Sequence, residues 1–131
     1  MNAPSEDIKD MLEDHSALGL TFASNLFIGR TPKEPDDAVT IFDYEGYSPD
    51  PTLEKDTMIY YSSLQIQVRS NGYVTGMTLA RNIMDYLHSR AQEEWNGTLY
   101  TAIRAMGEPV PLSWDDNGRI IFTINFNLMR R

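Results

Sequence analysis

Asp85 and His88 are residue types that bind divalent metals, and their spacing suits a helix. They lie three positions apart in a segment with helical periodicity, so both side chains are expected on one helix face. No third ligand is evident, and such pairs are common on helix surfaces, so we predict no metal site there. His15, the other histidine, falls on the inward side of an expected first helix, where we interpret it as a structural residue.

Asp115 and Asp116 are a second place to consider, because paired carboxylates can hold a cation or act as a general base. They directly precede Asn117-Gly118, and Asx residues before a tight turn are ordinary turn chemistry. The sequence also lacks the motifs of nucleophile elbows, phosphate-binding loops and zinc proteases. We therefore predict no enzyme and no catalytic, cofactor-binding or metal-binding residues. A hydrolase that uses either acidic site is kept as an alternative.

The overall composition indicates a small folded protein with an excess of negative charge. The 131 residues carry a net charge of −8, are 41% hydrophobic and include no cysteine. This length suits a single domain, residues 1–131, and the composition excludes disulfides and thiolate chemistry. The charge has the wrong sign for gripping phosphates, and the arginines are scattered. Without a signal peptide or a long apolar run, we expect neither secretion nor membrane insertion.

Hydrophobic periodicity predicts two helices and five strands. The first helix, which Ser5 can cap, has Ile8, Met11 and Leu12 on one face, and the second covers residues 73–90. The strands are expected at residues 20–28, 39–44, 58–70, 99–106 and 120–129. The order is therefore α-β-β-β-α-β-β. We predict an α+β fold with a mostly antiparallel sheet of about five strands and two helices packed on one face.

The last predicted strand is the most informative element of the chain. Asn117-Gly118 supplies the residues of a type I′ hairpin turn, and large apolar side chains then alternate from Ile120 to Leu128. The opposite face of this strand is polar but uncharged and carries Thr123, Asn125 and Asn127. We predict these three as interface residues, on an edge or barrel wall that a partner completes.

Residues 45–56 contain four acids and two prolines, which neither a helix nor a strand ladder accommodates well, so we predict a long exposed loop. The segment lacks the spacing of an EF-hand calcium loop. Loops of this length in compact domains commonly have a function. We therefore predict that residues 34–56 include an arm that contacts another subunit or a partner. The residues assigned to this contact are Tyr47, Asp50, Glu54 and Asp56.

Short patterns along the chain carry a resemblance to a known family. A helix containing residues 8–12 precedes a strand that ends in Phe27-Ile28-Gly29. The segment 64–69, Leu-Gln-Ile-Gln-Val-Arg, leads through a short polar turn into a helix. Residues 111–119, Pro-Leu-Ser-Trp-Asp-Asp-Asn-Gly-Arg, and residues 122–126, Phe-Thr-Ile-Asn-Phe, form a closing hairpin pattern. In element order, length and these motifs, the chain resembles the tail terminator family of long-tailed bacteriophages, whose members are often called minor capsid proteins.

The resemblance implies a small subunit of the virion, assembled in the host cytoplasm, that forms a ring, usually a hexamer. Such a ring caps the head-proximal end of the tail tube, ends tube polymerisation and presents a surface for head-tail joining. The implied partners are further copies of the chain, the tail tube protein and the head-tail connector or stopper protein. DNA passes through the lumen without specific binding, and no cofactor is implied. The acidic composition agrees, because a negative lumen repels phosphates.

Two further functions stay open at this point. The chain could be another connector ring protein (a stopper) or a tail tube subunit, and a tube subunit is expected to polymerise without limit on its own. It could instead be a generic protein-binding module that takes up a peptide by strand addition at its C-terminal edge. Such a module is expected to be monomeric.

Overall fold

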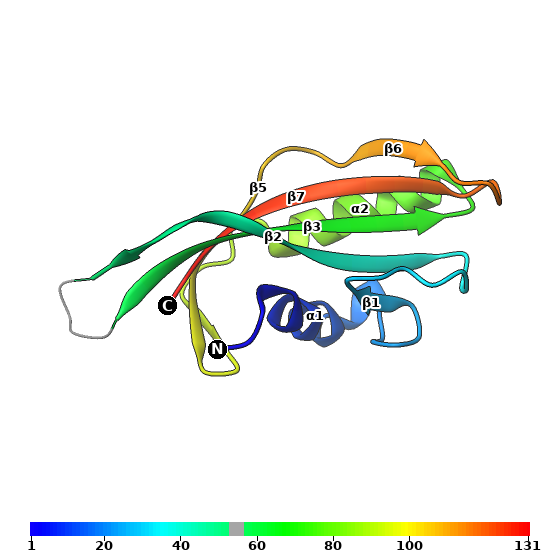
Figure 1. Ribbon diagram of the computed structural model, residues 1–131. Coiled ribbons are helices and arrows are strands. Elements are labelled where there is room, and N and C mark those ends of the chain that lie inside the picture. The colour runs from blue at the N-terminus through cyan, green and yellow to red at the C-terminus, as the bar shows by residue number, and fades with distance from the viewer. Residues whose placement is uncertain (53–56) are drawn as a thin grey trace.

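The computed structural model describes residues 1–52 and 57–131 (Figure 1). Its helical elements are α1 (Pro4–Asp14), the short 3-10 helix η1 (Ser16–Leu18) and α2 (Tyr73–Leu87). Its strands are β1 (Leu26–Ile28), β2 (Ala38–Pro51), β3 (Met58–Ser70), β4 (Glu93–Trp95), β5 (Thr98–Ala105), β6 (Val110–Trp114) and β7 (Ile120–Arg130). The predicted order is correct up to α2, but the described chain has two strands, β4 and β6, that were not predicted.

The described strands form one mixed sheet with the order β1-β2-β3-β7-β5-β4. β6 also pairs with β7, beyond the part of β7 that pairs with β5. β1 lies parallel to β2, while the other pairs are antiparallel. The prediction of a mostly antiparallel sheet of about five strands was therefore wrong. Residues 29–37 return the chain to the end of the sheet where β1 begins, so β2 runs in the same direction as β1.

The two unpredicted strands have sequences without the usual strand pattern. β4 has three residues, two of which are Glu93 and Glu94, so no alternation can be seen. β6 contains Pro111, which cannot donate a ladder hydrogen bond. The proline is tolerated because, among the described strands, β6 has a neighbour only in β7 and therefore lies at an edge of the sheet.

A single core lies between one face of the sheet and the helices. The apolar helical side chains with no exposed surface are Ile8, Met11, Leu12, Ala80, Ile83 and Leu87. The central strands contribute every second residue, namely Val39, Ile41, Leu64, Ile66, Val68, Ile120, Phe122, Ile124, Phe126 and Leu128. This alternation follows from the pleat of a strand, in which neighbouring side chains point to opposite faces. The predicted α+β class is confirmed, and both helices contribute to the same core.

Boundaries were predicted best where the periodic pattern was long. β3 has the predicted ends, and β7 extends one residue beyond them. The first strand is much shorter than predicted, because the side chain of Asn25 holds a turn by bonding the backbone of Thr21 and Gly19. α2 ends at Leu87 rather than residue 90, and Ser89 has a positive φ of 71°. No helix in the described part of the chain has the length and apolarity to cross a membrane.

The predicted loop at residues 45–56 was wrong for residues 45–51, which continue β2. β2 and β3 remain paired out to Pro51 and Met58, with register shifts on either side of Tyr47. Such bulges leave residues out of the ladder, and this accommodates prolines and an acidic sequence in a strand. The paired ends of β2 and β3 consequently project beyond the helices (Figure 1). Of the predicted contact residues, Glu54 and Asp56 lie outside the described residues.

Candidate assembly interface

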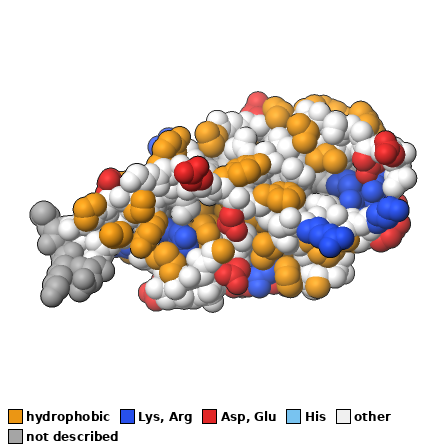
Figure 2. Space-filling model, viewed as in Figure 1, with side chains coloured by type: hydrophobic (Ala, Val, Ile, Leu, Met, Phe, Trp, Pro, Cys, Tyr) orange, Lys and Arg blue, Asp and Glu red, His pale blue; other side chains and the backbone are white. Residues whose placement is uncertain are grey.

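The projecting hairpin end, residues 44–51 and 58–62, is called the arm below. It carries four of the seven tyrosines of the chain, Tyr44, Tyr47, Tyr60 and Tyr61. Tyr47 is 65% exposed and Tyr44 is 54% exposed, and Met58 is exposed as well. Figure 2 shows hydrophobic side chains gathered over this end of the molecule. Tyrosine is enriched at protein interfaces because it combines a large apolar ring with a polar end, so the arm has the composition of a contact surface.

Gly46 positions the exposed side chains of the arm. It has a left-handed backbone, with φ of 71°, at the first register shift between β2 and β3. A Cβ at this position would lie 2.2 Å from the carbonyl oxygen of Tyr61, so only glycine fits. Beyond the shift, Tyr47 pairs with Tyr61, which places two aromatic side chains at one position along the arm.

The arm is acidic as well as aromatic. A hydrogen bond with Asp50 raises the pKa of the Tyr61 hydroxyl, so this tyrosine stays neutral across the physiological range. Glu45 and Asp50 have no ion pair with any cation among the described residues. The arm therefore offers a partner both apolar rings and carboxylates that its own described chain does not neutralise.

A ladder of uncharged polar side chains crosses the open face of the sheet, next to the arm. Asn125 accepts a hydrogen bond of 3.0 Å from the amide of Gln65, and Asn127 accepts one of 2.8 Å from the hydroxyl of Ser63. Tyr44, at the base of the arm, donates to Gln65 over 3.3 Å. Two of the predicted interface residues of β7, Asn125 and Asn127, therefore lie on one continuous surface with the arm.

The third predicted interface residue of β7 has a different position. Thr123 is only 7% exposed and pairs with Val110 of β6 and Gln67 of β3. Tyr47 and Asp50, in contrast, lie on the exposed arm. The structure thus brings together the arm and the exposed end of β7, while Thr123 is covered by its own chain. A role of these residues in an interface stays a prediction.

Two arginines organise the opposite end of the sheet. Arg69 donates to the carbonyls of Pro35 (2.5 Å) and Asp36 (3.2 Å), and Arg119 donates to the carbonyl of Lys33 (2.5 Å). Arg119 also bonds Asp115 through its Nε atom over 2.7 Å. Burial, with the nearby Arg119 charge, lowers the pKa of Arg69. These bonds hold the loop of residues 29–37 against the sheet.

The two acidic sites considered from the sequence do not form a catalytic arrangement. Asp115 accepts hydrogen bonds of 2.9 Å from the backbone of Asn117 and of Arg119, so it shapes the hairpin turn. The Nδ1 atom of His88 accepts the backbone N–H of Ala105 over 2.9 Å, which ties α2 to β5. Among the described residues, no group of three His, Asp or Glu side chains could hold a metal ion.

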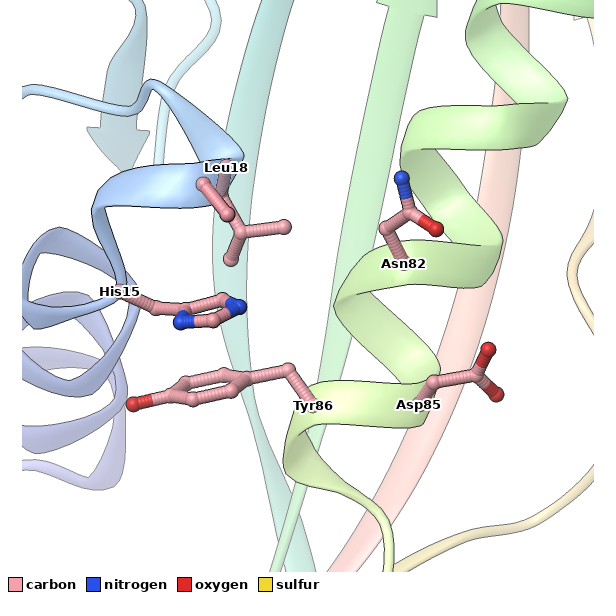
Figure 3. Close-up of a pocket in the computed structure, with 6 residues that line it drawn as sticks. His15, Leu18, Asn82, Asp85 and Tyr86 are labelled. Atoms are coloured by element: carbon pink, nitrogen blue, oxygen red, sulfur yellow. The ribbon is translucent and has the colours of Figure 1, made fainter.

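A hollow of about 440 Å³ lies between η1 and α2, lined by His15, Ala17, Leu18, Asn82, Asp85 and Tyr86. His15 stacks on Tyr86 with ring centroids 4.3 Å apart and ring planes within 3°. In Figure 3, the carboxylate of Asp85 points away from His15 rather than towards it. The histidine therefore packs one helix against the other, as the sequence interpretation had it, and the hollow has no converging polar groups.

β6 carries exposed apolar side chains that were not predicted from the sequence. Leu112 is 60% exposed and Trp114 is 57% exposed, and Val110 is exposed as well. Their spacing of two residues was the signal that could have revealed them, but Pro111 concealed the strand. Figure 2 shows hydrophobic side chains over this region, far from the arm.

The fold of the chain is similar to those of solved structures. A chain described as "Virion of native gene transfer agent (GTA) particle" is similar with a TM-score of 0.70 at 12% identity, covering 98% of this chain and 94% of that chain. A second solved structure has a TM-score of 0.50 at 13% identity, covering 96% of this chain and 90% of that chain. At these identities the likeness establishes a shared fold. No curated protein matches the chain in sequence.

The sequence of the chain matches the model of a known protein family. The model described as "Bacteriophage tail terminator protein" matches residues 7–130, which include every described strand and nearly all of both helices. This match agrees with the resemblance carried by the strand at residues 64–69 and by the closing hairpin. The chain belongs to the bacteriophage tail terminator protein family and has a structural role in a phage tail.

Proposed function

We propose that copies of this chain form a closed ring, expected to be a hexamer, that caps the head-proximal end of a phage tail tube. The ring ends polymerisation of the tube protein and presents its other side to the head-tail connector. Family membership supports this role. The shape of the chain supports it as well, because different surfaces at its two ends favour head-to-tail contacts, and such contacts close into a ring at a suitable rotation.

The arm is the observation that carries this proposal. None of residues 44–51 is buried, although β2 and β3 stay paired out to Pro51 and Met58. A two-stranded hairpin without a core beneath it gains little stability by itself. Its exposed tyrosines gain much more when another protein covers them. The arm is therefore an element for contacts between molecules.

The net charge supports a ring through which DNA moves freely. At −8 the chain repels phosphates, and its cations at the loop end are partly held by ion pairs such as Arg119 with Asp115. A cationic lumen would instead bind the backbone and release counterions. In this proposal DNA accordingly passes through the ring without binding to it.

Tube capping by the purified chain tests the proposal. The chain is added to tail tube protein of the same phage during polymerisation, and tube length and tip shape are followed by negative-stain electron microscopy. We expect growth to stop and a ring to close one tip. Sedimentation of the chain alone should give a monomer or one finite multiple of 15.0 kDa. Unlimited fibres of the chain alone would instead identify a tube subunit.

Substitutions then locate the capping surface. Replacement of Tyr47, Asp50, Glu54 and Asp56 by alanine should abolish capping, because these changes remove a large ring and an acid of the arm together with two acids of the segment that connects its strands. Replacement of Glu94 and Asp116, which are exposed acids elsewhere on the chain, should leave capping unchanged. If the arm variant still caps tubes, the arm is not the assembly element.

A further inference from the structure

The exposed apolar surface at the β6 end can receive the arm. It consists of Tyr73, Leu112 and Trp114 and is called the β6 patch below. Tyr73 joins the strand residues because its ring contacts Phe122 edge-on at 5.1 Å, and Phe122 pairs with Pro111 of β6. All three side chains are at least 45% exposed. Apolar side chains that stay in water do not contribute to the stability of the fold, so their exposure calls for another explanation.

The size of the β6 patch suits a specific contact. An aromatic side chain has roughly 150–250 Å² of surface, so the exposed parts of Tyr73 and Trp114 alone amount to about 150–250 Å². With Leu112 the patch reaches about 300 Å², a size at which exposed apolar patches commonly mark interaction sites. A standard interface buries about 800 Å² per partner, so the β6 patch has the size of the apolar centre of such an interface, which polar side chains would surround.

The arm and the β6 patch of one molecule cannot meet. Tyr47 of the arm pairs with Tyr61 of β3, whereas Trp114 pairs with Ile120, which in turn pairs with Ser70. Tyr61 and Ser70 both lie on β3, and at roughly 3.3 Å per residue they are separated by about 30 Å along the strand. Both surfaces belong to the same paired sheet, so neither can fold back onto the other. Only a second molecule can bring them together.

We propose that the arm of one copy docks on the β6 patch of the next copy. Tyr44 and Tyr47 cover Leu112 and Trp114, so both apolar surfaces leave water in one contact. The contact is made mainly by side chains, because Pro111 removes a donor from the free edge of β6 and interrupts a continuous strand ladder. Each copy offers one arm and one patch, which makes the contact heterologous and directional.

This inference rests on the proposed function, which requires copies to associate side by side, and it names the two surfaces that do so. A surface that paired with itself would give dimers and stop there. A contact between two different surfaces repeats from copy to copy, and it closes only when the rotation per copy divides a full turn. The arm and the β6 patch therefore provide a ring with its single repeated contact.

Disulfide trapping tests the contact, and the cysteine-free sequence provides a clean background. Tyr47→Cys and Leu112→Cys are introduced separately, in chains of distinguishable mass, and the two proteins are mixed at high concentration with the thiol oxidant diamide. We expect mostly a reducible dimer of one chain of each kind. The double variant should form a ladder of reducible multimers. Phe22→Cys is the matched control, because this residue is an exposed aromatic outside both surfaces.

The outcomes separate this inference from the proposed function. Equal trapping of Tyr47→Cys with Leu112→Cys and with Phe22→Cys would overturn the docking contact, and so would trapping of Tyr47→Cys only with itself. If the chain caps tubes but the expected disulfide never forms, the inference fails and the proposed function stands. If the disulfide forms while the chain neither closes into rings nor caps tubes, the contact stands and the proposed function fails.

Discussion

The hydroxyl of Tyr100 donates a hydrogen bond to the carboxylate of Asp7, and both side chains are fully buried. Asp7 lies in the first turn of α1, where the helix dipole favours a negative charge, and Tyr100 lies on β5. Asp7 also accepts a hydrogen bond of 2.7 Å from Asn96 in the β4–β5 turn. Burial, together with the bond to Asp7, raises the pKa of Tyr100, so its hydroxyl remains a donor. This pair fixes α1 to the end of the sheet.

Tyr100→Phe is expected to destabilise the fold by about 1–3 kcal/mol, because it leaves a buried carboxylate oxygen without its donor. Urea unfolding followed by circular dichroism measures the change. Tyr73→Phe is the matched control, since the ring of Tyr73 packs edge-on against Phe122 and the residue is 45% exposed. Equal stability losses in the two variants would show that the Asp7 contact contributes nothing specific.

The Asp115 turn should make stability depend on pH in the acid range. The backbone N–H of Arg119, followed by its guanidinium, lowers the pKa of Asp115 below the ordinary value of 3.8. Its stabilisation is therefore complete above that value and is lost as the pH falls through the folded-state pKa. Asp115→Asn should flatten the loss of thermal stability between about pH 5 and pH 2.

Asp116→Asn provides the control for this experiment. It removes the same charge from the same turn, but its side chain is exposed and takes no part in the bonds to Arg119. Its acid profile should match the unmodified chain. If both variants flatten the profile equally, then net charge rather than the turn geometry sets the acid sensitivity.

Gly76→Ala should destabilise the chain although alanine is the better helix former. The exchange gains about 1 kcal/mol of helix propensity. A Cβ at Gly76 would, however, lie 2.7 Å from the ring of Phe122 and 3.0 Å from the Cβ of Ser70. Overpacking of a buried site costs about 1–3 kcal/mol, so the clash outweighs the gain.

A second substitution that makes the Phe122 side chain smaller tests whether its ring causes the destabilisation. Adding Phe122→Leu to Gly76→Ala makes room for the new methyl group, so the double variant should be less unstable than the sum of the two single changes. Thermal unfolding of the three variants gives this coupling. Strictly additive losses would show that the ring of Phe122 is not what excludes a side chain at this position.

The sequence predicted those elements whose signal is long and whose surroundings agree with it. β3 and β7 show strict alternation over most of their length, and α1 has its apolar residues at helical spacing, so each was placed nearly correctly. The direction of a strand relative to its neighbours gives no such signal in the sequence. The alternation of residues 20–28 is the same in a parallel as in an antiparallel strand, and the sheet was therefore predicted as mostly antiparallel, whereas it is mixed.

The exposed surfaces of the proposed interface could be predicted only in part, for a related reason. Tyr47 and Asp50 were correctly placed on an exposed segment. The neighbouring Pro49 and Pro51, however, concealed the fact that this segment is a strand, which bulges allow to stay paired with β3. Trp114 and Leu112 were not singled out, because Pro111 looked like the end of a strand. In both cases an edge position tolerates a residue that the interior of a sheet excludes. Which residues lie at an edge depends on the order of strands, and local sequence does not contain that order.

Gly46→Ala should impair the arm while the rest of the chain stays folded. The new methyl group would collide with the carbonyl of Tyr61 at 2.2 Å, and a positive φ is unfavourable for alanine, so the bulge must rearrange and shift the register beyond it. Local strain of this kind costs about 1–3 kcal/mol. The arm has no helix beneath it, so we expect little change in the thermal transition of the core but faster amide exchange at Tyr47, Ser48 and Asp50. Tube capping and trapping between Tyr47→Cys and Leu112→Cys should both fall strongly.

Gly97→Ala is the matched control for this last variant. Gly97 has a positive φ of 81°, but no atom lies within 4 Å of a Cβ placed there, so it carries the backbone penalty without the collision. It lies in the β4–β5 turn, outside the residues of the arm and of the β6 patch. Gly97→Ala should therefore lower stability slightly and leave capping and trapping intact. If Gly46→Ala loosens the arm and capping continues undiminished, then the ordered arm is not needed for assembly, and the contact must lie on the open face of β7 instead.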